Sequence, residues 1–165
     1  MTYIKIATTD FSAVSSVSIE NVFSASYQHY LVVRNLLGSV GGASLDVRLR
    51  VSGTDSSGAD YRRQLVSADS TSVAGVRVTG NTAWVSALGV NEATAIGYDA
   101  LRISNPFETV RTTAWTDVGY TVTGNITLAR QVMAHDLATS YTSLTVLPSS
   151  GTITGSITVY GLKGA

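Results

Sequence analysis

The chain has 165 residues, a length that predicts a single domain over residues 1–165 with one hydrophobic core. It contains no cysteine, which excludes disulfides and thiolate metal sites. Its formal net charge is zero and only 13% of its residues are charged, which excludes a generally basic surface for nucleic acid or anionic lipid.

The first segment, MTYIKIATTDF, lacks the basic stretch and the long apolar run of a signal peptide. No stretch approaches the roughly 18 consecutive apolar residues of a membrane helix, so we expect a soluble chain without membrane insertion. Arginine outnumbers lysine nine to two, and arginine is the cation that protein–protein interfaces favour.

Strands are predicted throughout the first half of the chain. The first candidates are residues 3–7 and 14–23. The segment 30–37 (YLVVRNLL) is apolar on both faces, as in a central strand. After a glycine-rich turn, residues 45–52 alternate strictly between apolar and polar, and residues 53–60 (GTDSSGAD) form a loop.

Further strands are predicted at residues 61–67, 75–78, 84–88, 99–104, 110–117, 120–128 and 144–147. Gly124-Asn125 is an alternative turn within the sixth of these. Apolar spacing in residues 129–139 fits a helix, although the all-β surroundings favour another structure.

The closing segment, residues 151–160 (GTITGSITVY), has the clearest period of two. Ile153, Gly155, Ile157 and Val159 share one face, and threonine, serine and tyrosine occupy the other. Many short strands with Gly, Ser and Asn turns predict an all-β fold, an antiparallel β-sandwich with a jelly-roll-like topology.

The residues suited to catalysis form no recognisable motif. His29 and His135 make no zinc pattern without cysteine, and we expect both at the solvent surface or at an interface. Asp55, Asp60 and Asp69 do not match the spacing of a calcium loop and are better explained as residues that stabilise turns. We therefore expect no enzyme activity, no cofactor and no metal site.

One charged row is a candidate oligomer interface. Asp46, Arg48 and Arg50 share the polar face of the strand predicted at residues 45–52. Such a row either forms a solvated outer face or pairs across an oligomer axis, and its composition fits both interpretations equally.

Three aromatic residues are candidate glycan contacts. Exposed aromatic rings stack on sugars and anchor interfaces, which points to Tyr61, Trp84 and Trp115. Core packing is the more common role for the two tryptophans.

The order of several segments resembles a known family. These segments are residues 23–27, YLVV at 30–33, VRLR at 47–50, GADY at 58–61, LTV at 144–146 and SITVYG at 156–161. Together they resemble the small β-sandwich proteins of tailed bacteriophage virions, such as head-fibre, decoration and minor tail proteins. The resemblance omits residues 67–104. It implies a jelly-roll-like module, commonly trimeric, on the virion exterior, without catalytic residues.

Two functional hypotheses follow. The first is a non-enzymatic structural protein of a tailed phage virion, a homotrimer that contacts other virion proteins on the capsid or tail. The second is a carbohydrate-binding module that recognises a host surface glycan.

Overall fold

The computed structural model describes residues 2–90, 97–122 and 125–163. Every regular element in these ranges is a β-strand, and every pairing between them is antiparallel. The strands are β1 (Thr2–Val14), β2 (Val17–Ile19), β3 (His29–Gly38), β4 (Ala43–Val51), β5 (Thr54–Asp55), β6 (Tyr61–Asp69), β7 (Ser72–Asn81), β8 (Trp84–Val90), β9 (Gly97–Ser104), β10 (Thr112–Val122), β11 (Asn125–His135), β12 (Ser143–Pro148) and β13 (Ile153–Lys163).

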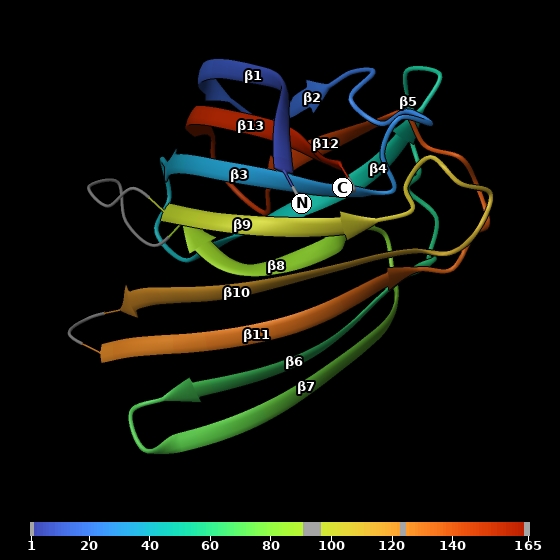
Figure 1. Cartoon of the computed structure of the whole chain (residues 1–165). Coiled ribbons are helices and arrows are strands. Elements are labelled where there is room, and N and C mark those ends of the chain that lie inside the picture. The colour runs from blue at the N-terminus through green and yellow to red at the C-terminus, as the bar shows by residue number, and fades with distance from the viewer. Residues whose placement is uncertain (1, 91–96, 123–124, 164–165) are drawn as a thin grey trace.

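The strands form two sheets that pack face to face (Figure 1). Sheet A has eight strands in the order β1-β13-β3-β9-β10-β11-β6-β7. Sheet B has the order β2-β12-β4-β5, and β8 also pairs with β4. The predicted antiparallel β-sandwich is confirmed, whereas the finer prediction of a jelly roll is not established by this strand order.

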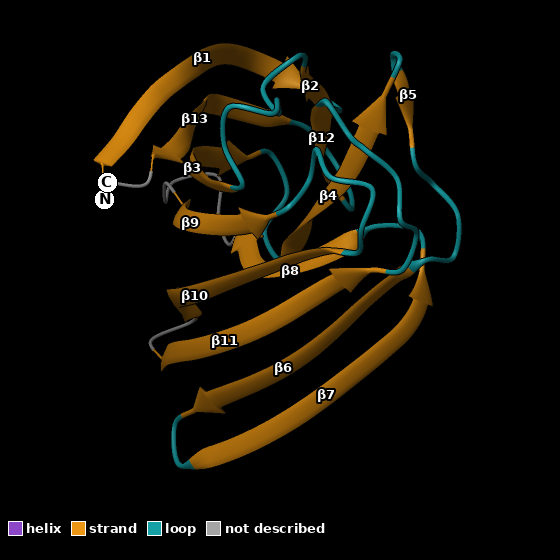
Figure 2. Cartoon of the chain, turned by 45° about the vertical axis from the view of Figure 1, so that its right-hand side comes forward, coloured by secondary structure: helices purple, strands orange, loops and turns teal. Residues whose placement is uncertain are grey.

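Sheet B covers only part of sheet A. Strands β2, β12, β4 and β5 lie with β1, β13 and β3, while β10, β11, β6 and β7 extend away from them (Figures 1 and 2). Strand β8 bridges the two regions, because it contacts β3, β9, β10, β11 and β6. We call β10, β11, β6 and β7 the wing.

The core lies between the two sheets and follows the alternation of their strands. The inward residues Ile153, Ile157 and Val159 of β13 are fully buried, as the sequence predicts for the closing segment. They belong to one apolar cluster with Val32 of β3 and Val47 of β4. Strand β13 is an interior strand of sheet A, because it pairs with β1 on one side and β3 on the other.

One ion pair is buried in this core. Arg34 of β3 lies opposite Asp99 of β9, and both side chains are inaccessible to solvent. The Nε atom of Arg34 donates to Asp99 Oδ1 at 2.7 Å, and its Nη2 atom donates to Ser86 Oγ of β8 at 3.0 Å. Removing either ion would leave an uncompensated buried charge, so this cluster favours a single register between β3, β9 and β8.

Several predicted elements differ from the structure. Strand β1 covers thirteen residues, far more than the predicted 3–7, and the predicted strand at 14–23 is reduced to β2. Strand β7 extends on both sides of the predicted 75–78. Residues 129–139 contain no helix, because β11 continues through them to His135.

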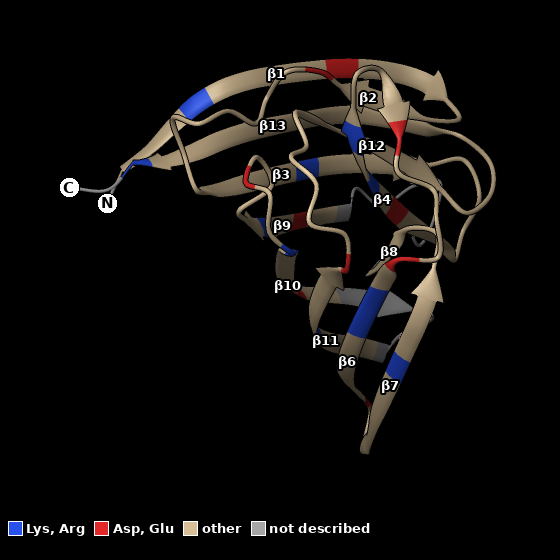
Figure 3. Cartoon of the chain, turned by 90° about the vertical axis from the view of Figure 1, so that its right-hand side faces the viewer, with Lys and Arg blue, Asp and Glu red and all other residues tan. Residues whose placement is uncertain are grey.

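The alternative turn near residue 124 is the correct one. Strands β10 and β11 pair up to Val122 opposite Asn125, so the chain reverses between them. Gly124 itself lies outside the described residues. Positions of Lys and Arg and of Asp and Glu are distributed along the strands of both sheets (Figure 3).

The closing strand offers a direct stability test at Gly155. Its φ is +148°, and a Cβ atom there would lie 2.0 Å from the backbone oxygen of Asn35. We expect Gly155→Ala to lower the free energy of unfolding by about 3 kcal/mol or more. Gly42, at φ +77° with nothing within 4 Å of an added Cβ, is the matched control, for which Gly42→Ala should cost about 1–2 kcal/mol. Equal losses in denaturant titrations of the two variants would contradict this packing.

Candidate functional site

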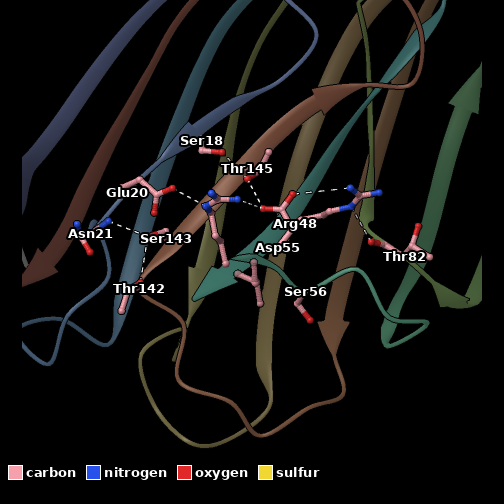
Figure 4. A network of polar contacts seen from close by, with 12 residues as sticks. Ser18, Glu20, Asn21, Arg48, Asp55, Ser56, Thr82, Thr142, Ser143 and Thr145 are labelled. Atoms are coloured by element: carbon pink, nitrogen blue, oxygen red, sulfur yellow. Dashed lines mark hydrogen bonds and ion pairs between the residues drawn. The ribbon is translucent and has the colours of Figure 1, made fainter. Parts of the chain in front are cut away.

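The charged row of β4 lies on the outer face of sheet B, where its charges are satisfied within the chain. Arg50 donates to Asp55 Oδ1 at 2.7 Å and to Glu20 Oε1 at 2.6 Å. Arg48 donates to the backbone oxygen of Thr82 at 3.2 Å, and its Nη1 lies 3.9 Å from Asp55 Oδ2 (Figure 4). These contacts raise the pKa of Arg50 above its usual value, chiefly through the hydrogen bond to Asp55.

Asp55 is the centre of this network rather than a simple turn residue. It also accepts a hydrogen bond from Thr145 Oγ1 at 2.6 Å, and Thr145 in turn contacts Ser18 Oγ at 2.9 Å (Figure 4). The network therefore joins β5, β12, β2 and β4.

Asp46, the third residue of the charged row, accepts a hydrogen bond from Ser44 Oγ at 3.2 Å, and burial raises the pKa of its carboxyl. A contact of this row with another copy stays a prediction.

Two of the three predicted glycan contacts are core residues. Tyr61 is fully buried and Trp84 is 1% exposed, and their rings meet edge to face at 5.7 Å. The Tyr61 hydroxyl accepts from Leu49 N at 2.9 Å and donates to Ser56 O at 2.8 Å, while Trp84 Nε1 donates to Ala134 O at 3.0 Å. A glycan cannot reach either ring, so that prediction is wrong for Tyr61 and Trp84.

His135 lies in the same cluster, where the wing joins the sandwich. It is fully buried, with Nε2 3.1 Å from Ser56 Oγ and Nδ1 3.3 Å from the Tyr141 hydroxyl. Its ring packs edge to face on Tyr61 at 4.4 Å. The expectation of a solvent or interface histidine is therefore wrong for His135. His29, in contrast, is exposed.

Trp115 is the one predicted glycan contact that lies at the surface. It is half-buried on the outer face of sheet A, opposite Arg102 of β9 and Val132 of β11. The Arg102 guanidinium lies 4.2 Å from the ring centroid, and that of Arg130 lies 5.7 Å away. A hollow of about 270 Å³ opens beside it. Glycan contact by Trp115 stays a prediction that this position favours.

The wing exposes apolar side chains that the sequence did not single out. We call them the wing patch. The exposed fractions are 48% for Val66, 75% for Val73, 75% for Ile126, 60% for Leu128 and 57% for Val132. All five lie on the outer face of the wing. On β11, Val132 lies opposite the outward-facing Trp115, and Leu128 and Ile126 share its face because side chains alternate along a strand. Across the strands, Arg130 lies opposite Val66, and Ala68 lies between Leu128 and Val73.

The missed signal was the apolar outer face of β11. Ile126, Leu128 and Val132 occupy that face, while the buried face alternates Ala129 and Met133 with polar residues, which are Thr127, Gln131 and His135. A solvated face in a half-covered sheet is normally polar, so an apolar outer face indicates a contact surface.

The described residues contain no group of three or more His, Asp or Glu side chains arranged to hold a metal ion. In the same part of the chain, no helix is long and apolar enough to cross a membrane. No family model, curated protein or solved structure matches this chain.

Burial of His135 predicts a pH-dependent stability. Desolvation lowers the pKa of its imidazole, despite the nearby carboxylates of Asp60 and Asp136. The folded chain thus binds fewer protons than the unfolded chain just below the unfolded pKa of about 6.5. Stability is complete above about pH 6.5 and falls as the pH drops below it, by at most about 1.4 kcal/mol per pH unit.

Denaturant unfolding between about pH 7.5 and about pH 5 measures this slope. We expect His135→Gln to be less stable but to have a flatter pH profile than the original chain. The matched control His29→Gln, at an exposed position, should keep the original slope. An unchanged slope in His135→Gln would show that another group is responsible.

Proposed function

We propose that this chain is a non-enzymatic structural protein of a tailed bacteriophage virion. It acts as a decoration, head-fibre or tail-associated module on the particle surface, where it assembles with its own copies, as a homotrimer, and with other virion proteins. The observation that carries this proposal is the apolar patch on the outer face of the wing.

The wing patch supports assembly through the energetics of burial. Monomeric proteins rarely expose contiguous apolar patches of more than a few hundred Å², and larger ones mark interaction sites. Leu128, Ala68 and Val73 follow one another across β11, β6 and β7, and Val66 lies in the next row of the same face. Arg130 separates Leu128 from Val132 on β11. Burial of a leucine or valine side chain stabilises a contact by roughly 1.5–3 kcal/mol.

Strand β7 supports the same conclusion. Its residues 72–77 are exposed on both faces, and β7 is an edge of sheet A. Ordering a strand costs roughly 1–2 kcal/mol per residue in backbone entropy, and little burial offsets that cost here. A free edge also presents unpaired N–H and C=O groups to a neighbouring chain.

The two edges of sheet A support a cyclic assembly. Strand β1 is the opposite edge, and it is thirteen residues long against ten for β7. Heterologous contacts use two different surfaces of each copy and close into a ring when the rotation allows. Edge β1 of one copy and edge β7 of the next are such a pair of surfaces.

The outer face of sheet B is a weaker candidate for the contact. Arg48 and Arg50 already have partners in Glu20, Asp55 and Thr82. Exposed pairs of this kind contribute only about 0–1 kcal/mol, so exchanging them for contacts with another copy gains little.

Carbohydrate binding is the second candidate, and one observation favours it. Trp115 lies at the surface beside a hollow, with Tyr3 on the opposite wall. Aromatic residues beside polar groups are the usual composition of a small-ligand site.

Size-exclusion chromatography with light scattering tests the assembly proposal. We expect a species of three times the chain mass of 17.3 kDa. Leu128→Glu, in the wing patch, should shift the population toward monomer, because it places a charge in a buried contact. Val110→Glu, at an exposed apolar residue outside the wing, is the matched control and should leave the trimer intact.

A monomer at all concentrations would overturn the assembly proposal. The virion assignment has its own test, which is immunogold labelling of purified phage particles with an antibody against the chain. Labelled capsids or tails support it, and unlabelled particles beside a labelled host lysate contradict it.

A further inference from the structure

The hollow beside Trp115 is built by five neighbouring strands of sheet A. Tyr3, Leu162, His29 and Ser104 follow one another across β1, β13, β3 and β9 in a single register row. Arg102 and Trp115 lie side by side in the next row, on β9 and β10. All of these side chains line the hollow, which lies on the outer face of the sheet.

Arg102 has no anionic partner among the described residues. Six of the nine arginines have a carboxylate oxygen within 4.0 Å, namely Arg34, Arg48, Arg50, Arg62, Arg111 and Arg130. Arg102 and Arg77 have neither a carboxylate partner nor a hydrogen bond in the described part of the chain, and of these two only Arg102 lines the hollow. Its Cζ atom lies over the Trp115 ring, 4.2 Å from the ring centroid.

The contact with Trp115 positions the Arg102 guanidinium at the hollow without using its hydrogen-bond donors. Its N–H groups make no hydrogen bond to the described residues, so they are available to the two oxygens of a carboxylate while the cation stays over the ring. The other nearby cation does not compete for the ligand, because Arg130 pairs with Asp117 at 3.0 Å. The hollow therefore offers one oriented, uncompensated positive charge.

The remaining walls suit a small polar ring. His29 Nδ1 and Ser104 Oγ lie 3.0 Å apart, and both side chains keep further capacity for hydrogen bonds with hydroxyl groups. Tyr3 is 47% exposed, and its ring is held edge to face against Tyr160 at 6.4 Å. Its exposed ring and Leu162 supply apolar surface for the C–H face of a sugar.

We propose that this hollow binds a carboxylate-bearing sugar residue, such as a uronic or sialic acid. Arg102 binds the carboxylate, Ser104 and His29 contact hydroxyl groups, and Tyr3 packs on the ring. The volume of about 270 Å³ lies just below the roughly 300–1,000 Å³ of pockets for drug-sized ligands, so it suits a single ring. A small inorganic anion would leave the apolar walls unused.

The site lies within one chain and does not depend on the trimer proposed above. Every lining residue comes from the same copy of sheet A, outside the wing patch. Binding and assembly can therefore fail separately. A monomeric Leu128→Glu variant should bind the sugar as well as the original chain does.

Isothermal titration with defined probes tests this inference. Methyl β-D-glucuronide and N-acetylneuraminic acid are titrated against methyl β-D-glucoside and acetate. We expect at least one acidic sugar to bind, with an affinity about tenfold or more above that of the neutral glucoside and of acetate. No binding by either acidic sugar, or equal binding by the glucoside, overturns the inference. Equal binding by acetate would show that the hollow binds small anions without selecting a sugar, and it would also overturn the inference.

Variants then assign the residues. Arg102→Gln should weaken binding about tenfold or more, and Arg102→Lys should be intermediate, because it keeps the charge but loses the two-pronged geometry. Arg77→Gln, at an exposed arginine on the same face of the sheet but in the wing, should leave binding unchanged. Tyr3→Ala should weaken the sugar more than acetate. An unaffected Arg102→Gln variant with an unchanged melting temperature would place the sugar elsewhere.

Discussion

The core packs against the inner face of sheet A from β13 to β11 but does not reach β7, and the proposed assembly depends on the surface that remains exposed in this part of the sheet. The core contains inward residues of β13, β3, β4 and β12, and it also includes Ala114 of β10 and Met133 of β11. Beyond β8, the wing is joined to the sandwich by the buried cluster of Tyr61, Trp84 and His135. A half-covered antiparallel sheet is stable in water when its second face is polar, but Ile126 and Leu128 make that face apolar here.

The two outer faces of the sandwich consequently differ in chemistry. On sheet B, the cations of β4 are neutralised by Glu20 and Asp55, so this face is complete in a single chain. On sheet A, the wing patch lacks an apolar partner and Arg102 lacks an anionic one among the described residues. Both features lie on one continuous surface, in neighbouring strands. Sheet A is therefore the face where we place both the assembly contact and the sugar site.

The sequence alone predicted the elements whose burial alternates. Residues 45–52 and 151–160 alternate because one face of each strand meets the core, and both are strands. Strand β1 was underestimated because its residues are mostly exposed on both faces, which removes the periodic signal. The helical spacing predicted for residues 129–139 came from Leu128 and Val132, which are four residues apart and share the outer face of β11.

The candidate site was harder to predict, since it depends on long-range pairing. The sequence does not distinguish the three candidate aromatic residues from one another. In the structure, Tyr61 and Trp84 face the core, whereas Trp115 lies on the outer face of sheet A. His135 is buried because it pairs with Tyr61 across β11 and β6, a contact between residues far apart in the chain. The row that brings Tyr3 opposite Leu162 and His29 opposite Ser104 likewise requires the strand order of sheet A.

Hydrogen–deuterium exchange at low and high protein concentration tests most directly whether the wing is a contact surface. If another copy covers it, amides of β7 at residues 72–81 gain protection as concentration rises, while those of β4 exchange slowly at both concentrations. Rapid exchange of β7 at every concentration, in a sample in which β4 is protected, would contradict the proposed role of the wing.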